Sequence, residues 1–104
     1  MLLKIAINKM NYQIRITKAV ERDIKKLDLQ VKQALKEHLL ALSKNPNLGR
    51  LLSGRFGYLW SYHFSFNKVE YRIIYEIIKD EIVISILLVG TRENIYKQLM
   101  RRLK

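Results

Sequence analysis

Hydrophobic and polar residues alternate along two stretches of the chain in the period-two pattern of β-strands. Residues 12–17 alternate in this way, which predicts a first strand with one buried face. Residues 58–66 also alternate, with aromatic side chains on one face and small or polar side chains on the other. After a polar turn at 67–70, residues 71–78 and then 82–89 are almost uniformly apolar. The second half of the chain is therefore predicted to form a β-meander.

Helical spacing marks three further segments. Apolar residues after Thr17 recur at i, i+4 and i+7, which predicts a helix capped by the Thr17 hydroxyl. A second apolar stripe covers 31–42 and must end before Pro46, and a short helix is expected at 95–103. The predicted order is β-α-α-β-β-β-α. It gives an α+β fold in which a helical hairpin packs on one face of a small, mostly antiparallel four-stranded sheet. Residues 82–89 are apolar on both sides and should be its central strand.

Length and composition limit the class of protein. A chain of 104 residues is enough for one domain, so residues 1–104 are predicted to be a single domain with its core in 10–100. Residues 1–9 are expected to be a leader or an extension of a strand. The chain has no cysteine and no apolar run of the length that a membrane span requires. We expect a cytoplasmic protein without a disulfide framework and without a membrane partner.

The chain is strongly basic. Twenty Lys and Arg residues stand against nine Asp and Glu, which gives a net charge of +11 spread along the whole chain. Such a field attracts polyanions, so nucleic acid or an acidic protein is the expected partner. The two histidines, His38 and His63, fall in different predicted elements. No metal site and no cofactor are predicted.

Two features of the predicted sheet could carry chemistry. Arg72 interrupts an apolar strand, where a guanidinium is costly unless it pairs with a glutamate or faces a phosphate. Both explanations are open, and Glu70, Glu76 and Glu93 are the candidate glutamates. The aromatic row could stack nucleic-acid bases, but a sheet covered by two helices needs an apolar inner face, so core packing is expected. His63 would then lie on the opposite, open face.

Three segments together resemble the RelE/ParE toxin superfamily of type II toxin–antitoxin systems: GYLW at 57–60, YRIIYEI at 71–77 and VGTRENIYK at 89–97. The resemblance implies a small basic toxin that a co-encoded antitoxin protein neutralises. In the RelE branch the toxin is a metal-independent endoribonuclease that cleaves mRNA on the ribosome through attack by a ribose 2′-hydroxyl. In the ParE branch it inhibits DNA gyrase without catalysis. A basic RNA-binding module is a third possibility.

The resemblance also assigns residues. Arg72 matches the family arginine that binds the scissile phosphate, Arg92 the arginine that stabilises the transition state, and Tyr96 the acid/base or base-stacking tyrosine. Relatives usually carry Lys or Arg at the positions of Ser61 and His63. His63 is therefore expected to take a proton-transfer or phosphate role. The residues predicted to bind RNA are Arg50, Arg55, His63 and Lys68.

Overall fold

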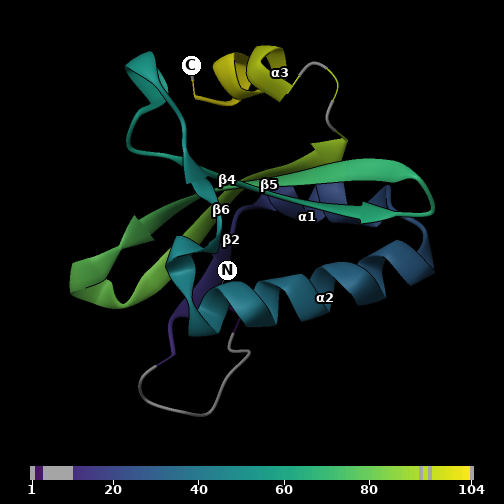
Figure 1. Ribbon diagram of the computed structural model, residues 1–104, viewed down its shortest axis with the longest axis horizontal. Coiled ribbons are helices and arrows are strands. Elements are labelled where there is room, and N and C mark those ends of the chain that lie inside the picture. Colours follow the sequence, from purple (N-terminus) through teal and green to yellow (C-terminus); the bar gives the residue numbers. More distant parts are fainter. Residues whose placement is uncertain (1, 4–10, 92, 94, 104) are drawn as a thin grey trace.

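The computed structural model describes residues 2–3, 11–91, 93 and 95–103. Its centre is one sheet in the order β1-β2-β6-β5-β4-β3 (Figure 1). The strands are β1 (Leu2–Leu3), β2 (Gln13–Ile16), β3 (Arg50–Leu51), β4 (Trp60–Phe66), β5 (Val69–Ile78) and β6 (Val83–Thr91). Strand β2 runs parallel to β6, and the other pairs of described strands are antiparallel. The predicted α+β fold is confirmed, with β6 at the centre of the sheet.

The observed sheet differs from the predicted one at its edges. Strands β1 and β3 have two residues each, which is too short for a period-two pattern, so the sequence predicted four strands only. Strand β4 begins at Trp60 and not at residue 58. Tyr58 was expected in the buried aromatic row, but it precedes the strand and is 52% exposed. The later aromatic residues of that row, Trp60, Tyr62 and Phe64, do pack in the core as predicted.

The turn between β4 and β5 is tighter than the predicted turn at 67–70. Strand β4 ends at Phe66 and β5 starts at Val69, so only Asn67 and Lys68 connect them. Both connecting residues have positive φ, 49° and 67°, as a type I′ hairpin turn requires. This turn fixes the register, because it pairs Phe66 with Val69 and every earlier pair follows from it.

Three helices form the layers around the sheet: α1 (Lys18–Lys25), α2 (Leu29–Lys44) and α3 (Ile95–Arg102). Thr17 caps α1 as predicted, since its Oγ1 accepts a hydrogen bond of 3.2 Å from the Val20 N–H. Helices α1 and α2 lie on one face of the sheet and α3 lies on the other (Figure 1). Within the described residues, no helix is long and apolar enough to cross a bilayer.

Each face of the sheet has its own apolar cluster. Under α1 and α2, aliphatic side chains of the helices pack on Ile14, Ile84, Ile86 and the aromatic residues of β4 and β5. On the other face, Ile95 and Leu99 of α3 pack on a smaller cluster from the sheet. This second cluster contains Leu59, Ile74 and Leu88. Because α3 is short, it covers only part of its face, and no other described helix covers the rest.

Tyr75 ties the sheet to the loop that follows α2. Its ring is fully buried, and its hydroxyl donates a hydrogen bond of 2.6 Å to the Pro46 carbonyl and accepts one of 3.1 Å from the Gly49 N–H. Burial raises the pKa of Tyr75 to about 12, so the hydroxyl keeps its proton. A Cβ at Gly49 would lie 2.7 Å from the Tyr75 hydroxyl and 2.8 Å from the Ser61 carbonyl oxygen, so this close approach requires glycine.

Replacing Tyr75 with phenylalanine is expected to destabilise the fold by about 1–2 kcal/mol, because the Pro46 carbonyl and the Gly49 N–H lose their shared partner. For a domain of this size the melting temperature should fall by about 4–8 °C for each kcal/mol. Thermal unfolding followed by circular dichroism measures this. Tyr58→Phe is the matched control, since Tyr58 is half exposed. Equal melting temperatures for the two variants would contradict the role of the Tyr75 hydroxyl.

Candidate functional site

The part of the sheet that α3 leaves uncovered carries a set of polar side chains, here called the open face. The strand register puts Arg72 of β5 directly opposite His63 of β4 and opposite Gly90 of β6. Ser65 lies two residues beyond His63 on the same side of β4. Arg50 of β3 pairs with Ser61, which places Arg50 on this side of the sheet as well. The open face therefore consists of Arg50, His63, Ser65 and Arg72.

Arg72 is the central cation of the open face. Its Nη2 lies 4.0 Å from Glu70 Oε1, so a salt bridge to Glu70, one of the two explanations left open above, exists at the limit of contact distance. The Nε atom is buried and has no hydrogen-bond partner in the described part of the chain. The side chain is 24% exposed. Because the Arg72 side chain still reaches solvent, its guanidinium can bind an incoming oxyanion. The two-pronged guanidinium matches the geometry of a phosphate.

Gly90 leaves space beside Arg72. It has no side chain, and among the described residues a Cβ built there would meet only Gln98 Oε1 of α3, at 3.9 Å. The sheet surface next to Arg72 is therefore bounded by backbone on the β6 side and by the His63 side chain on the β4 side. A phosphate could approach the guanidinium through this gap.

The two histidines have different environments. His63 is exposed on the open face, and its Cβ is expected about 5 Å from that of Arg72, the usual spacing of a cross-strand pair. His38 of α2 lies on the other side of the sheet, where its ring stacks on Phe64 at 4.3 Å and its Nδ1 lies 2.5 Å from the Tyr62 hydroxyl. Burial lowers the pKa of His38. His63 is thus the histidine that a substrate could reach.

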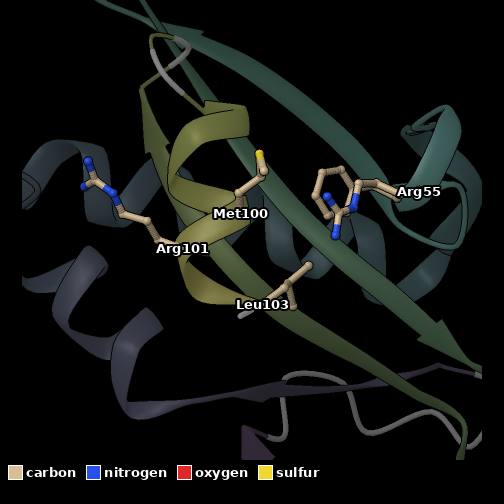
Figure 2. Close-up of a pocket in the computed structure, with 5 residues that line it drawn as sticks. Arg55, Met100, Arg101 and Leu103 are labelled. Carbon is tan, nitrogen blue, oxygen red and sulfur yellow. The ribbon is translucent and has the colours of Figure 1, made fainter.

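The other predicted RNA-binding residues lie in two places. Lys68 lies in the β4–β5 turn beside a shallow cavity of about 620 Å³ that Ser65 and Glu70 also border. Arg55 lies in the 3-10 turn η2 (Gly54–Phe56), with its guanidinium carbon 5.6 Å from the centre of the Phe56 ring. Figure 2 shows Arg55 beside the C-terminal end of α3. The fold therefore gathers Arg50, His63 and Arg72 on one face and holds Arg55 apart from them.

Tyr96 lies in the first turn of α3 and is 50% exposed. Ile95 and Leu99 turn inward and hold the helix on the sheet. Helical spacing puts Tyr96 on the same side of α3 as Met100 and Leu103, which face the η2 turn. The Tyr96 side chain is therefore half exposed on the side of α3 that carries Met100. Arg92, the remaining predicted catalytic residue, lies outside the described residues.

Asp23 and Arg102 position α3, a role that no sequence pattern indicates. The Asp23 carboxylate of α1 accepts two hydrogen bonds from the Arg102 guanidinium, at 2.6 and 3.1 Å. Its Oδ2 also accepts the Val89 N–H at 3.1 Å, and Arg102 Nη1 donates to the Leu87 carbonyl at 3.1 Å. The pair joins helices from the two opposite layers at one edge of β6. In the described part of the chain, no three His, Asp or Glu side chains gather as a possible metal site.

A family model described as a ParE-like toxin of type II bacterial toxin–antitoxin systems matches residues 14–100 of the chain. The match spans β2 to α3 and so includes the open face, Arg92 and Tyr96. Comparison with curated protein sequences gave no match.

Solved structures of RelE toxins have the same fold. The toxin–antitoxin complex RelBE2 from Mycobacterium tuberculosis contains a chain that is 26% identical, with a TM-score of 0.72 over 84% of this chain and 98% of that one. A free RelE toxin of Escherichia coli, in which two arginines are replaced by alanine, is 20% identical, with a TM-score of 0.73 over 91% and 100% of the two chains. The intact E. coli RelBE toxin–antitoxin complex matches at 19% identity and a TM-score of 0.67, over 80% and 98%.

Proposed function

The chain belongs to the ParE-like toxin family of type II bacterial toxin–antitoxin systems, and from this premise we propose that it is an endoribonuclease that cleaves mRNA on the ribosome. A protein with this function acts in the cytoplasm, where it meets translating ribosomes. The net charge of +11 supports a polyanionic substrate.

One observation carries the proposal of catalysis. Arg72 lies on an open sheet face with a buried Nε that has no hydrogen-bond partner among the described residues. An inhibitor that works only through surface complementarity has no need of an arginine held in this way inside an apolar strand, where its desolvation is costly. A ribonuclease needs such a group, because its transition state carries extra charge on the phosphate oxygens.

The proposed reaction is an internal transfer at the RNA backbone. The 2′-oxygen attacks the adjacent phosphorus, a new 2′-O–P bond forms, and the bond from phosphorus to the 5′-oxygen breaks. The proton of the 2′-hydroxyl passes to a base, and an acid supplies a proton to the leaving 5′-oxygen. The products are a 2′,3′-cyclic phosphate and a 5′-hydroxyl. The step needs one proton acceptor, one proton donor and a cation at the phosphate.

The residues of the chain can be assigned to these roles. Arg72 binds the scissile phosphate, and Arg92 adds positive charge as the transition state forms. His63 is exposed opposite Arg72 in the sheet, and a neutral imidazole ring offers a nitrogen that accepts a proton, so it suits the role of proton acceptor. Tyr96 is then the proton donor or a surface on which a base stacks. Arg50 and Lys68 hold the RNA backbone farther from the reacting bond.

Mapping of mRNA 5′ ends tests this proposal. Expression of the wild-type chain in a bacterial host should produce growth arrest and new ends inside translated codons of ribosome-bound mRNA. Arg92→Ala removes one cation and Tyr96→Phe removes one hydroxyl, and each is expected to lower cleavage by about a hundredfold. Circular dichroism of the purified variants checks that they are folded. Wild-type cleavage in both variants would contradict the assigned roles.

The proposed partner besides RNA is an antitoxin protein encoded next to this chain. RelE toxins are solved in complex with RelB antitoxins in the matching structures from M. tuberculosis and E. coli. An antitoxin for this chain should be acidic where it covers the open face, because the toxin presents Arg50, His63 and Arg72 there.

Inhibition of DNA gyrase is the second candidate function. It is favoured by the family model, whose description is ParE-like, and by Ser61, which stands where RelE-like relatives usually carry a basic residue. In that case toxicity should persist in Arg92→Ala and Tyr96→Phe, mRNA should stay intact, and plasmid DNA should lose negative supercoiling. The same cultures that supply mRNA for end mapping supply plasmid for this measurement. A basic RNA-binding module is less well supported, because Trp60, Tyr62 and Phe64 pack in the core.

A further inference from the structure

A pocket lies between the C-terminal end of α3 and the η2 turn, and it is here called the α3 pocket (Figure 2). Its volume is about 350 Å³. The residues that line it are Arg55, Phe56, Met100, Arg101 and Leu103. Its surface is mostly apolar, although it opens directly to solvent, and Met100 is 52% exposed. The fold thus leaves an apolar surface of side-chain size uncovered on a strongly basic protein.

Arg55 gives the α3 pocket a positive border. Its guanidinium carbon lies 5.6 Å from the centre of the Phe56 ring, a cation–π contact that restrains the long side chain. Figure 2 shows the Arg55 side chain beside the pocket, opposite Met100 and Leu103. Arg101 also borders the pocket, but its guanidinium points away on the other side of α3 (Figure 2). One restrained cation therefore stands next to an apolar cavity.

We propose that the α3 pocket binds one apolar side chain from an acidic segment of the antitoxin. This inference deepens the proposed function, because it rests on a co-encoded antitoxin. The apolar lining selects an aliphatic or aromatic anchor, and Arg55 pairs with a carboxylate next to that anchor in the sequence. The net charge of +11 draws in an acidic segment and disfavours a basic one.

A peptide side chain fits the α3 pocket better than a nucleobase. The guanidinium of Arg55 already lies over the Phe56 ring, and the neighbouring Met100 and Leu103 side chains are not aromatic. A base would leave its hydrogen-bonding edges buried against these apolar groups, which is unfavourable. An aliphatic side chain buries only apolar atoms there. Tyr96 and Met100 lie on the same side of α3, so a segment anchored in the pocket can continue along the helix toward Tyr96.

Calorimetric titration of the purified chain with the purified protein encoded by the neighbouring gene tests the proposal. Met100→Gln keeps the length of the side chain and the helix propensity but makes the pocket polar, and it should raise the Kd by about tenfold. Met100→Leu is its control and should leave the Kd within about twofold. Arg55→Glu should raise the Kd by about tenfold or more. Its control is Arg22→Glu, which makes the same change in net charge at an exposed position of α1, on the opposite face of the sheet.

The outcomes separate this inference from the proposed function. Equal Kd values for Met100→Gln and Met100→Leu, or for Arg55→Glu and Arg22→Glu, would contradict binding at the α3 pocket and would leave the toxin assignment unchanged. Absence of any complex with the wild-type chain would remove the proposed partner and the pocket together. The same variants are titrated with a ten-nucleotide single-stranded RNA. If Met100→Gln weakens binding of the RNA and not of the neighbouring protein, the pocket accepts nucleic acid and the proposal is wrong.

Discussion

Replacing Arg72 with alanine is expected to lower the rate of RNA cleavage by about 10²–10³-fold and to abolish growth arrest. The reason is electrostatic, because Arg72 is the cation at the centre of the open face and the transition state gains charge on the phosphate oxygens. The side chain is 24% exposed, so its guanidinium can reach a phosphate of the bound RNA. Single-turnover cleavage of a ribosome-bound mRNA measures the rate, and thermal melting checks that the variant is folded.

Two further substitutions make this experiment specific. Arg72→Lys keeps the charge but loses the two-pronged guanidinium, so it should restore only part of the activity, about tenfold below the wild type. Arg15→Ala makes the same change in net charge as Arg72→Ala, on β2, where Arg15 pairs with Glu81 at 3.2 Å. It should cleave at the wild-type rate. Equal rates for Arg72→Ala and Arg15→Ala would show that Arg72 contributes only to the general positive field.

The helices and the long strands could be predicted because their apolar periods extend over several residues. The apolar stripe of α2 and the alternation in β2 each predict one buried face. The apolar run of β6 predicts a strand that is buried on both faces. The edge strands β1 and β3 could not be predicted, since two residues carry no period. Tyr58 was assigned to the core because it continues the alternation of β4, but the chain leaves the η2 turn there and buries Leu59 instead.

The exposure of His63 on the face opposite the aromatic row was predicted, but its pairing with Arg72 was not. A four-residue turn at 67–70 would have paired His63 with Ile74, two positions from the observed partner. The positive φ angles of Asn67 and Lys68 make a two-residue turn, which brings His63 opposite Arg72. Lysine is unusual at positive φ, so the sequence favoured the longer turn. The predicted roles of Arg92 and Tyr96 come from the family resemblance alone and stay predictions.

The link between Asp23 and Arg102 could not be predicted, because 79 residues separate the two side chains in the chain. Local periodicity gives no information about contacts at such a distance. The need for the link comes from tertiary structure. Strand β2 pairs with β6 only as far as Ile86, so the Leu87 carbonyl and the Val89 N–H face an edge without a neighbouring strand. Asp23 and Arg102 satisfy these two backbone groups from opposite layers.

Asp23→Ala is expected to destabilise the protein by about 3 kcal/mol. It leaves Arg102 without its counter-charge and the Val89 N–H without an acceptor, in a site where the two side chains are 11% and 24% exposed. Urea unfolding measures the loss as a lower midpoint at constant slope. The control is Glu81→Ala, which breaks the exposed ion pair with Arg15 and should cost less than about 0.5 kcal/mol. Equal costs for the two variants would show that the Asp23 pair contributes no more than a surface ion pair.

The position of α3 links this stability to function. Asp23 and Arg102 hold the C-terminal end of α3, and α3 carries both Tyr96 and the Met100 side of the α3 pocket. Asp23→Ala should therefore raise amide hydrogen exchange in α3 more than in β5, which keeps its pairing with β4 and β6. It should also lower the rate of RNA cleavage at temperatures where the sheet is still folded, because α3 carries Tyr96, the proposed proton donor, and would no longer be held at its C-terminal end. Uniform loss of protection across α3 and β5 would mean that α3 unfolds only with the whole domain, and the separate role of this pair would be excluded.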